Sequence, residues 1–217
     1  MQQVQGGRIT SQFKATTSTI QWLDESGRLS PLLATPGRYD NVRFSPDGTR
    51  LAFQLADEKT WDVWAYEWKR KIPARLTFSE VTGPSWLAWS PDGGGLAFTS
   101  RRGAKAGDLF WKRADGRGDV QLLSEGAYLR LVRSWHPSGR YLAVTEVHSP
   151  TRSELMILPV ESDSASGFRS GRATSFAGGF VGQAAFSPDG RWLAYFSTET
   201  GRSEVYVRPF PVAAGQW

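Results

Sequence analysis

The sequence predicts an all-β protein built from repeated units of four antiparallel strands, and three observations support this prediction. A phrase of twelve residues occurs twice in nearly the same form, at 44–55 and 186–197. Related phrases begin at Phe44, Trp89, Trp135 and Phe186, so the steps between them, by subtraction, are 45, 46 and 51 residues. Each phrase is followed by a short aromatic and aliphatic run, which is typical of a buried strand.

The phrase itself predicts a hairpin turn. In Ser45-Pro46-Asp47-Gly48, proline presets φ for the second turn position, aspartate suits the third, and glycine takes the left-handed position that follows. This pattern is typical of a hairpin loop with a G1 bulge between antiparallel strands. Second strands are expected at 50–53, 95–98, 140–144 and 191–195, third strands at 62–66, 108–111, 154–158 and 204–208, and short fourth strands at 75–77 and 120–123. Four strands in about 45 residues predict the blade of a β-propeller.

The aspartates of the phrase have two interpretations. Asp47, Asp92 and Asp189 are either ligands and catalytic carboxylates, or turn formers that bond the local backbone. Their spacing follows the repeat, and the third copy has Ser138 in place of the aspartate. Both facts favour turn formers. His136, at the serine position of the third phrase, is likewise predicted to be a turn residue.

These phrases resemble the WD40-like PD40 repeats of TolB-type propellers. The stretches 20–28 and 204–211 also resemble the propeller that follows the kinase domain in bacterial eukaryotic-like serine/threonine kinases. The resemblance covers residues 18–217, and such propellers usually have six blades. It therefore implies about four blades' worth of a larger propeller, incomplete at both ends. The expected division is an irregular segment at 1–17, a partial blade at 18–34, blades at 39–79, 84–124 and 130–175, and an incomplete blade at 181–217.

Composition excludes several other classes of protein. The chain has no cysteine, hence no disulfide and no thiolate chemistry, and it has no apolar run as long as a membrane span. Residues 1–7 lack the apolar stretch of a signal peptide, so a soluble chain is expected, in a compartment that the sequence does not determine. The net charge of +5, with basic groups at 69–71 and 101–102 near Trp68 and Trp111, leaves an anionic polymer as an alternative partner. Charged turns that keep a repeat protein in solution explain the same residues and make nucleic acid the less favoured partner.

Motifs of catalysis are absent from the sequence. It contains no Gly-x-Ser-x-Gly elbow, no phosphate-binding glycine loop and no kinase signature. Candidate sites are therefore expected on the propeller rim, where the loops between second and third strands meet the connections between blades. Weak candidates for catalysis or for a divalent metal ion are Asp40, Glu146 and His148. Candidates for binding are Asp57, Glu58, Arg101, Arg102, Trp86, Arg130 and Gln183.

Three functions follow as hypotheses. The first is a non-enzymatic propeller that binds a protein, a peptide or a small ligand and needs no cofactor, as the resemblance implies. The second is a metal-assisted hydrolase of the lactonase or phosphotriesterase kind, and the third is an anionic polymer binder. Because removal of blades exposes apolar faces, a homo-oligomer is also expected. Its contacts would be made by Leu29, Leu32 and Leu33 at one end, and by Trp192, Tyr195, Val205 and Tyr206 at the other.

Overall fold

The computed structural model describes residues 17–57, 60–78, 86–100, 107–163 and 167–211. All regular elements in these ranges are strands, which confirms the all-β prediction. None of these residues lies in a helix, and hence no membrane-spanning helix is found in the described part of the chain. The chain divides into two compact units, Met1–Tyr39 and Asp40–Trp217, which are described separately.

The first unit contains an antiparallel hairpin. Strand β1 (Ser18–Leu23) pairs with the beginning of β2 (Leu29–Phe44), a strand that runs on into the second unit. The carboxylate of Asp24 closes the turn, since its Oδ1 accepts hydrogen bonds from the amides of Ser26 and Arg28, both at 2.9 Å. Gly27 in this turn has φ of 80°, a conformation that favours glycine. The separate partial blade expected at 18–34 stays a prediction.

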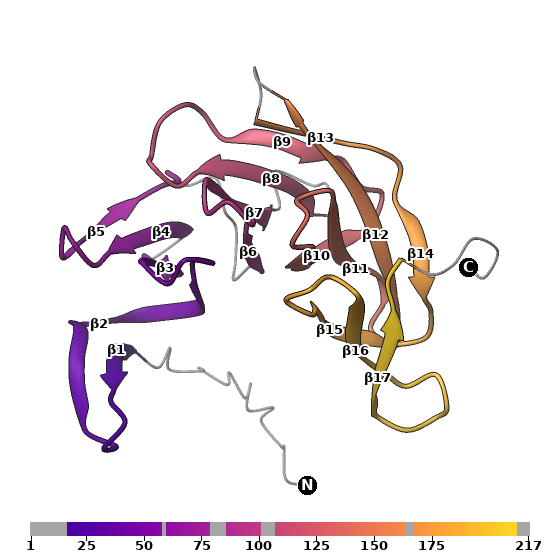
Figure 1. Ribbon diagram of the computed structural model, residues 1–217, viewed down its shortest axis with the longest axis horizontal. Coiled ribbons are helices and arrows are strands. Elements are labelled where there is room, and N and C mark those ends of the chain that lie inside the picture. The colour runs from indigo at the N-terminus through magenta and orange to yellow at the C-terminus, as the bar shows by residue number, and fades with distance from the viewer. Residues whose placement is uncertain (1–16, 58–59, 79–85, 101–106, 164–166, 212–217) are drawn as a thin grey trace, which may run out of the picture. The chain divides into compact units, whose positions relative to one another are not determined.

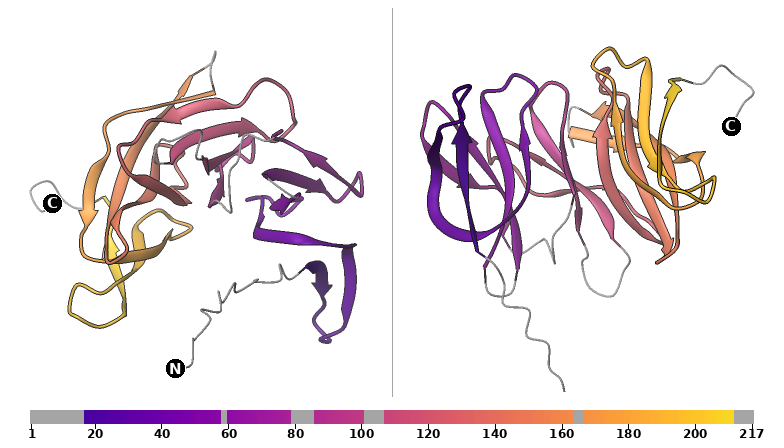
Figure 2. Two further views of the ribbon diagram at one scale, coloured as in Figure 1. Left: turned by 180° about the vertical axis from the view of Figure 1, so that it is seen from behind. Right: turned by 90° about the horizontal axis from the view of Figure 1, so that it is seen from below.

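The second unit consists, in its described residues, of four antiparallel sheets in chain order (Figures 1 and 2). The first sheet contains the end of β2, β3 (Arg50–Ala56), β4 (Trp61–Glu67) and β5 (Ile72–Arg75). The second contains β6 (Leu87–Trp89), β7 (Gly95–Ser100), β8 (Asp108–Arg113) and β9 (Gln121–Ser124). The third contains β10 (Leu129–Trp135), β11 (Tyr141–Ser149), β12 (Arg152–Asp163), β13 (Gly167–Ser170) and β14 (Thr174–Ala177), and the fourth contains β15 (Val181–Phe186), β16 (Trp192–Ser197) and β17 (Glu204–Pro209).

Consecutive sheets pack on one another through three apolar clusters. The cluster between the first and second sheets includes Val63 and Phe98, and the next includes Leu109 and Leu142. The third cluster joins Leu155 and other residues of the third sheet to residues of the fourth. The central side chains of these clusters are fully buried. Each middle sheet therefore uses both faces as core, which is why its strands are rich in large apolar residues on alternating and adjacent positions.

The four turn phrases share one geometry. In the first, the amide of Ser45 donates to the carbonyl of Arg50 at 2.9 Å, and the amide of Gly48 donates to the carbonyl of Ser45 at 2.9 Å. The other three phrases repeat both bonds, and their glycines at 48, 93, 139 and 190 have φ between 66° and 75°. Oδ1 of Asp47 accepts from the hydroxyl of Ser45 at 2.5 Å, and Asp92 and Asp189 do the same with their own serines. The prediction that these aspartates are turn formers is confirmed.

One predicted strand is shifted. The fourth strand of the first sheet ends at Arg75, whereas the sequence predicts it at 75–77. Thr77 instead bonds the third strand through its side chain: its hydroxyl donates to Asp62 Oδ1 at 2.8 Å and accepts from the amide of Val63 at 2.9 Å. The guanidinium of Arg75 also pairs with the buried carboxylate of Asp62. A side-chain network therefore adds to the backbone bond from the amide of Leu76 to the carbonyl of Val63, at 2.8 Å, at this end of β4.

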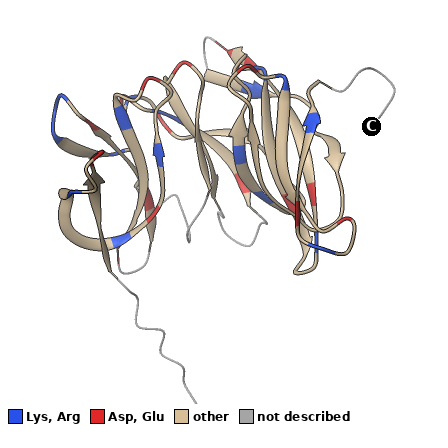
Figure 3. Ribbon diagram, turned by 60° about the horizontal axis from the view of Figure 1, so that its bottom comes forward, with Lys and Arg blue, Asp and Glu red and all other residues tan. Residues whose placement is uncertain are grey.

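Both signs of charge occur over the described part of the ribbon. Lysine and arginine are interspersed with aspartate and glutamate on the strands and turns of each unit (Figure 3). Many of the acidic groups are paired with basic neighbours, as in Arg113 with Asp115 and Arg169 with Asp163. An anionic polymer as partner stays a prediction.

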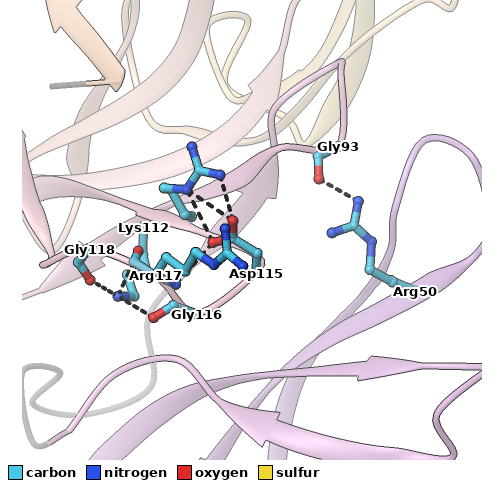
Figure 4. Close-up of polar contacts among 8 residues, drawn as sticks. Arg50, Gly93, Lys112, Asp115, Gly116, Arg117 and Gly118 are labelled. Atoms are coloured by element: carbon cyan, nitrogen blue, oxygen red, sulfur yellow. Dashed lines mark hydrogen bonds and ion pairs between the residues drawn. The ribbon is translucent and has the colours of Figure 1, made fainter. Parts of the chain in front are cut away.

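Polar side chains tie turns and loops together (Figure 4). Nη2 of Arg50 donates to the carbonyl of Gly93 at 2.6 Å, which joins the turn phrases of the first and second sheets. The buried ammonium of Lys112 donates to the carbonyls of Gly116, at 3.1 Å, and Gly118 in the loop after β8. These bonds satisfy loop carbonyls that the sheet ladders leave unpaired.

His136 makes the corresponding tie between the third and fourth sheets. Its Nδ1 accepts from the amide of Ser138 at 3.1 Å, so Nε2 carries the proton of the neutral ring and donates to the carbonyl of Gly190 at 3.0 Å. Beyond its predicted place in the turn, His136 thus contacts the neighbouring sheet.

The fourth sheet exposes apolar residues on one face, as predicted, but Tyr195 is not one of them. Trp192 and Val205 are 44% and 74% exposed, as expected for an open end. Tyr195 is only 1% exposed, because its ring faces Phe176 of the third sheet and stacks on Tyr206. Burial raises the pKa of Tyr195 to about 12. The prediction that Tyr195 belongs to the open face is therefore wrong. In the first unit, Leu29 is 60% exposed.

Candidate functional site

The first strands of neighbouring sheets lie side by side. Strand β10 is next to both β6 and β15 (Figure 1). In propellers these innermost strands line the central channel. A cavity of about 410 Å³ lies beside them, and we call it the inner cavity. Its lining residues are Arg43, Arg133, Ser134, Gln183, Ala184, Ala185, Ala194, Tyr195, Phe196 and Val205.

Arg133 is positioned by an irregularity in β10. The pairing register of β10 with β11 shifts between Val132 and Ser134, so Arg133 lies at a bulge. Bulges commonly redirect a side chain near a site. Nε of Arg133 donates to the hydroxyl of Thr145 at 2.8 Å, and its guanidinium lies over the ring of Trp86, 5.0 Å from the ring centroid. Thr145 in turn donates to the carbonyl of Gly182 at 3.1 Å, which links this arrangement to β15.

The guanidinium of Arg133 is held without a counter-charge. Among the described residues no carboxylate pairs with it, and its Nη1 is buried without a hydrogen-bond partner. Burial lowers the pKa of Arg133 from 12.5 to about 10, so the group stays positively charged at neutral pH. Arg43 adds a second cationic side chain to the lining, and none of the described lining residues is acidic. The inner cavity is therefore a positively charged site with largely apolar walls.

A larger cavity of about 600 Å³ lies at the turn phrases of the second and third sheets. Its charged lining residues are Asp92, Arg140 and Glu161, which carry both signs. Asp92 is already bonded to Ser90 and to the amide of Gly94. Because none of the buried unpartnered polar atoms of the described chain belongs to this lining, we place the candidate site in the smaller inner cavity.

The structure separates the predicted binding residues into two groups. Trp86 and Gln183 belong to the inner cavity arrangement, the first through its contact with Arg133 and the second as a lining residue. Arg130 instead pairs with Glu146, with 2.8 Å between its Nε and Oε2 of the carboxylate, and also donates to the hydroxyl of Ser124 at 2.9 Å. Arg130 thus belongs to an ion pair of the third sheet.

Two of the predicted catalytic or metal candidates lie in that same network. Nε2 of His148 is 3.8 Å from Oε1 of Glu146 and 3.4 Å from Oε2 of Glu154. The ring of His148 also packs edge-on against Tyr128, with 4.4 Å between centroids. Across the described ranges, no group of three or more histidine, aspartate or glutamate side chains has a geometry that could hold a metal ion. Participation of Glu146 and His148 in catalysis stays a prediction.

The remaining predicted residues are local. Oδ1 of Asp40 accepts from the amide of Asn41 at 2.7 Å, and Asn41 has φ of 49°. Asp57 accepts from the amide and hydroxyl of Thr60, at 2.7 and 3.0 Å, and so links the residue after β3 to the residue before β4. Glu58, Arg101 and Arg102 lie outside the described residues.

Sequence reasoning missed Arg133. It lies in the segment Leu129-Arg130-Leu131-Val132-Arg133-Ser134-Trp135, where two arginines interrupt an apolar strand. The signal was present in that interruption, but strand alternation cannot locate a bulge, so the direction of the second arginine could not be read from the sequence.

No protein-family model matches the chain. The Bacillus subtilis protein named uncharacterized peptidase YuxL is 29% identical over 208 residues, covering 76% of this chain and 31% of that protein. TolB from Acinetobacter baumannii superposes with a TM-score of 0.60 at 20% identity, over 85% of this chain and 44% of that chain. A puromycin-hydrolyzing peptidase from Mycobacterium tuberculosis superposes with a TM-score of 0.62 at 19% identity, over 86% of this chain and 32% of that chain.

The chain thus spans about a third of the length of the curated relative and less than half of either solved structure. At 19–20% identity, the likeness to the solved structures is one of fold. The resemblance to kinase-linked propellers stays a prediction. Repeated blades, turn phrases and structural likeness agree on one conclusion: the chain has the fold of a stretch of a TolB-like β-propeller.

Proposed function

We propose that this chain is a non-enzymatic binding propeller whose ligand enters the inner cavity. The observation that carries the proposal is Arg133, a residue of the cavity lining whose Nη1 is buried without a hydrogen-bond partner. Buried polar groups are normally bonded, and an unpaired buried cation is unfavourable for folding, so its retention points to a ligand. The propeller fold supports a binding role by analogy.

A substitution that fills the cavity tests this proposal. Ala185 is exposed on β15, lines the cavity and lies opposite Ala194 of β16, so Ala185→Trp narrows the cavity without entering the core. Ala74→Trp is the matched control, because Ala74 is an exposed strand residue of the first sheet outside the cavity. Peptides are selected from a random twelve-residue library on the purified chain, and their dissociation constants are measured by calorimetry.

The expected result is a loss of at least about tenfold in affinity with Ala185→Trp and no change with Ala74→Trp, since about 1.4 kcal/mol of lost contact corresponds to a factor of ten. Selected peptides that bind both variants as they bind the unsubstituted chain would show that the cavity is not the site. Failure to select any peptide would count against a peptide ligand.

A second candidate function is supported by the peptidase relatives. YuxL and the mycobacterial enzyme each align with this chain over about a third of their own length. In this interpretation the chain is the propeller part of a peptidase and admits a peptide substrate to a catalytic part that lies elsewhere. The purified chain should then hydrolyse neither puromycin nor aminoacyl anilides.

The same assay addresses the metal-assisted hydrolase and the polymer binder. A lactone and a phosphotriester are added to the substrate panel, with and without chelator. Turnover that disappears with chelator would replace the binding proposal by the hydrolase. Binding of single-stranded DNA that weakens steeply with salt would favour the anionic polymer instead.

The open face of the fourth sheet supports a homo-oligomer as a further part of the proposal. Val205 and Val207 are 74% and 60% exposed and lie on the same face of β17. Among the described strands, β17 pairs with β16 alone, which leaves an edge for another strand. Light scattering should give more than the 24.1 kDa of one chain. Lysine at both valines should return the mass to that of the monomer, and a monomeric unsubstituted chain would refute this part.

A further inference from the structure

The inner cavity combines a fixed cation with apolar walls. The charged lining side chains are Arg43 and Arg133, while Ala184, Ala185 and Ala194 belong to the apolar lining. Two fixed neighbours hold the guanidinium of Arg133: the hydroxyl of Thr145 bonds Nε at 2.8 Å, and the ring of Trp86 covers its plane at 5.0 Å. Both contacts leave Nη1 without a partner. The free donor is thus held in one orientation before any ligand binds.

From this arrangement we infer that the inner cavity captures the carboxylate at the C-terminal end of a peptide whose last side chain is apolar. The inference rests on the proposed binding function and names the class of its ligand. Nη1 of Arg133 would donate to a carboxylate oxygen, and the last side chain would lie against the alanines of the lining. A charge-assisted bond of this kind is about twice as strong as a neutral one.

The apolar share of the lining favours a carboxylate over a phosphate. A phosphate presents three strong acceptor oxygens and at neutral pH carries up to two negative charges, and it is usually met by several donors or backbone amides. In the described lining, Nη1 of Arg133 and the hydroxyl of Tyr195 are buried without partners, Arg43 adds a second guanidinium, and the remaining walls are mainly alanine, phenylalanine and valine. The hydroxyl of Tyr195 is thus a second buried donor of this lining, and the amide of Gln183 is a further neutral polar group. A carboxylate on an apolar body matches this lining.

A pair of peptides isolates the carboxylate. Acetyl-Gly-Ala-Leu is prepared with a free carboxylate and, separately, as the carboxamide, and both are titrated into the full chain by calorimetry at low salt. The carboxylate form should bind at least about tenfold more tightly, because it forms a charge-assisted bond with Arg133 that the carboxamide does not form. In Arg133→Gln, the two forms should differ by less than about twofold, while the carboxamide keeps its affinity. Arg172→Gln, which removes one exposed arginine away from the cavity, is the matched control and should behave as the unsubstituted chain.

A second variant guards against misfolding of the first. Gln183 is exposed and lines the cavity, so Gln183→Glu places a carboxylate beside Arg133 without disturbing the core. This internal carboxylate should compete with the ligand and abolish the preference for the free carboxylate. Unchanged preference in both Arg133→Gln and Gln183→Glu would overturn the assignment to Arg133.

The remaining outcomes separate this inference from the proposed function. If both peptides bind equally and Ala185→Trp weakens both, the binding propeller stands and carboxylate capture is wrong. If neither peptide binds, carboxylate capture is also wrong, and the library selection decides the proposed function by itself. Hexanoate and hexanamide distinguish the source of the carboxylate: hexanoate that binds as tightly as the peptide would overturn the peptide end in favour of a free carboxylic acid.

Discussion

Replacing Arg133 by methionine should raise the stability of the chain although it removes a polar residue with two good contacts. The side chain is held in a site where burial lowers its pKa from 12.5 to about 10. Both the folded and the unfolded chain carry the proton at pH 7, so the full penalty of the buried charge is present there. It is relieved only as the pH rises above about 10.

The magnitude follows from that difference. At about 1.4 kcal/mol per pKa unit, the folded state disfavours the charged guanidinium by about 3.5 kcal/mol. Methionine forfeits the bond to Thr145, worth about 1 kcal/mol, and the contact with Trp86, worth about 0.5–1 kcal/mol. The net gain is about 1.5–2 kcal/mol, which corresponds to a rise of about 3–8 °C in melting temperature for a chain of this size.

Urea unfolding and calorimetry at pH 7 measure the effect. Arg172→Met, at an exposed position, is the control and should leave the melting temperature unchanged. A melting temperature of Arg133→Met that is lower by about 2 °C or more would refute the reasoning, since about 2–4 °C corresponds to 1 kcal/mol in a chain of this size. Such a fall would mean that the two contacts outweigh the buried charge, and that retention of Arg133 needs no ligand to explain it.

Three further predictions concern the turns and one loop. The hydrogen bonds from Ser45 and then Thr49 lower the pKa of Asp47 from 3.8 to about 2, so this carboxylate stabilises the fold above about pH 4 and ceases to do so as the pH falls toward 2. Between these pH values the melting temperature should fall more for the unsubstituted chain than for Asp47→Asn. Equal falls in melting temperature would contradict this account. Gly190→Ala should lower the free energy of unfolding by about 2–3 kcal/mol, because the added Cβ would lie 2.5 Å from Nε2 of His136. Gly48→Ala has a similar φ but open space around its Cβ, so it should lose only about 1 kcal/mol in urea unfolding. Equal losses in the two variants would exclude the clash. Lys112→Met should lose about 2 kcal/mol in the same assay, since loop carbonyls lose their donor, and an unchanged midpoint would show that water replaces it.

The repeats made the blades predictable. A proline, an aspartate and a glycine in fixed order specify a local turn geometry, and the apolar runs beside them specify strands, so both follow from short-range sequence. The structure has the predicted turns at Gly48, Gly93, Gly139 and Gly190, with strands on either side. The same local logic identified the aspartates of the phrases as turn formers.

The candidate site was predictable only in part, because it depends on which side chains meet from different blades. The sequence predicts Trp86 and Gln183 as binding residues from their place in connections between blades, and both belong to the inner cavity arrangement. It predicts Arg130 on the same ground, yet Arg130 pairs with Glu146 within the third sheet. Connection residues share a rim, but their side chains point along different directions that packing decides.

The sequence by itself therefore determined the all-β class, the repeat and the conformation of the turns, since these are set by φ preferences and alternation over a few residues. Only the tertiary structure decided that Tyr195 is buried and that His136 bonds the next turn at Gly190. It also decided that Arg133, at a bulge of β10, lines a cavity whose described lining residues include no carboxylate. The physical reason is that burial, inter-sheet hydrogen bonds and unpaired charge depend on contacts between segments distant in the chain, which local patterns do not encode.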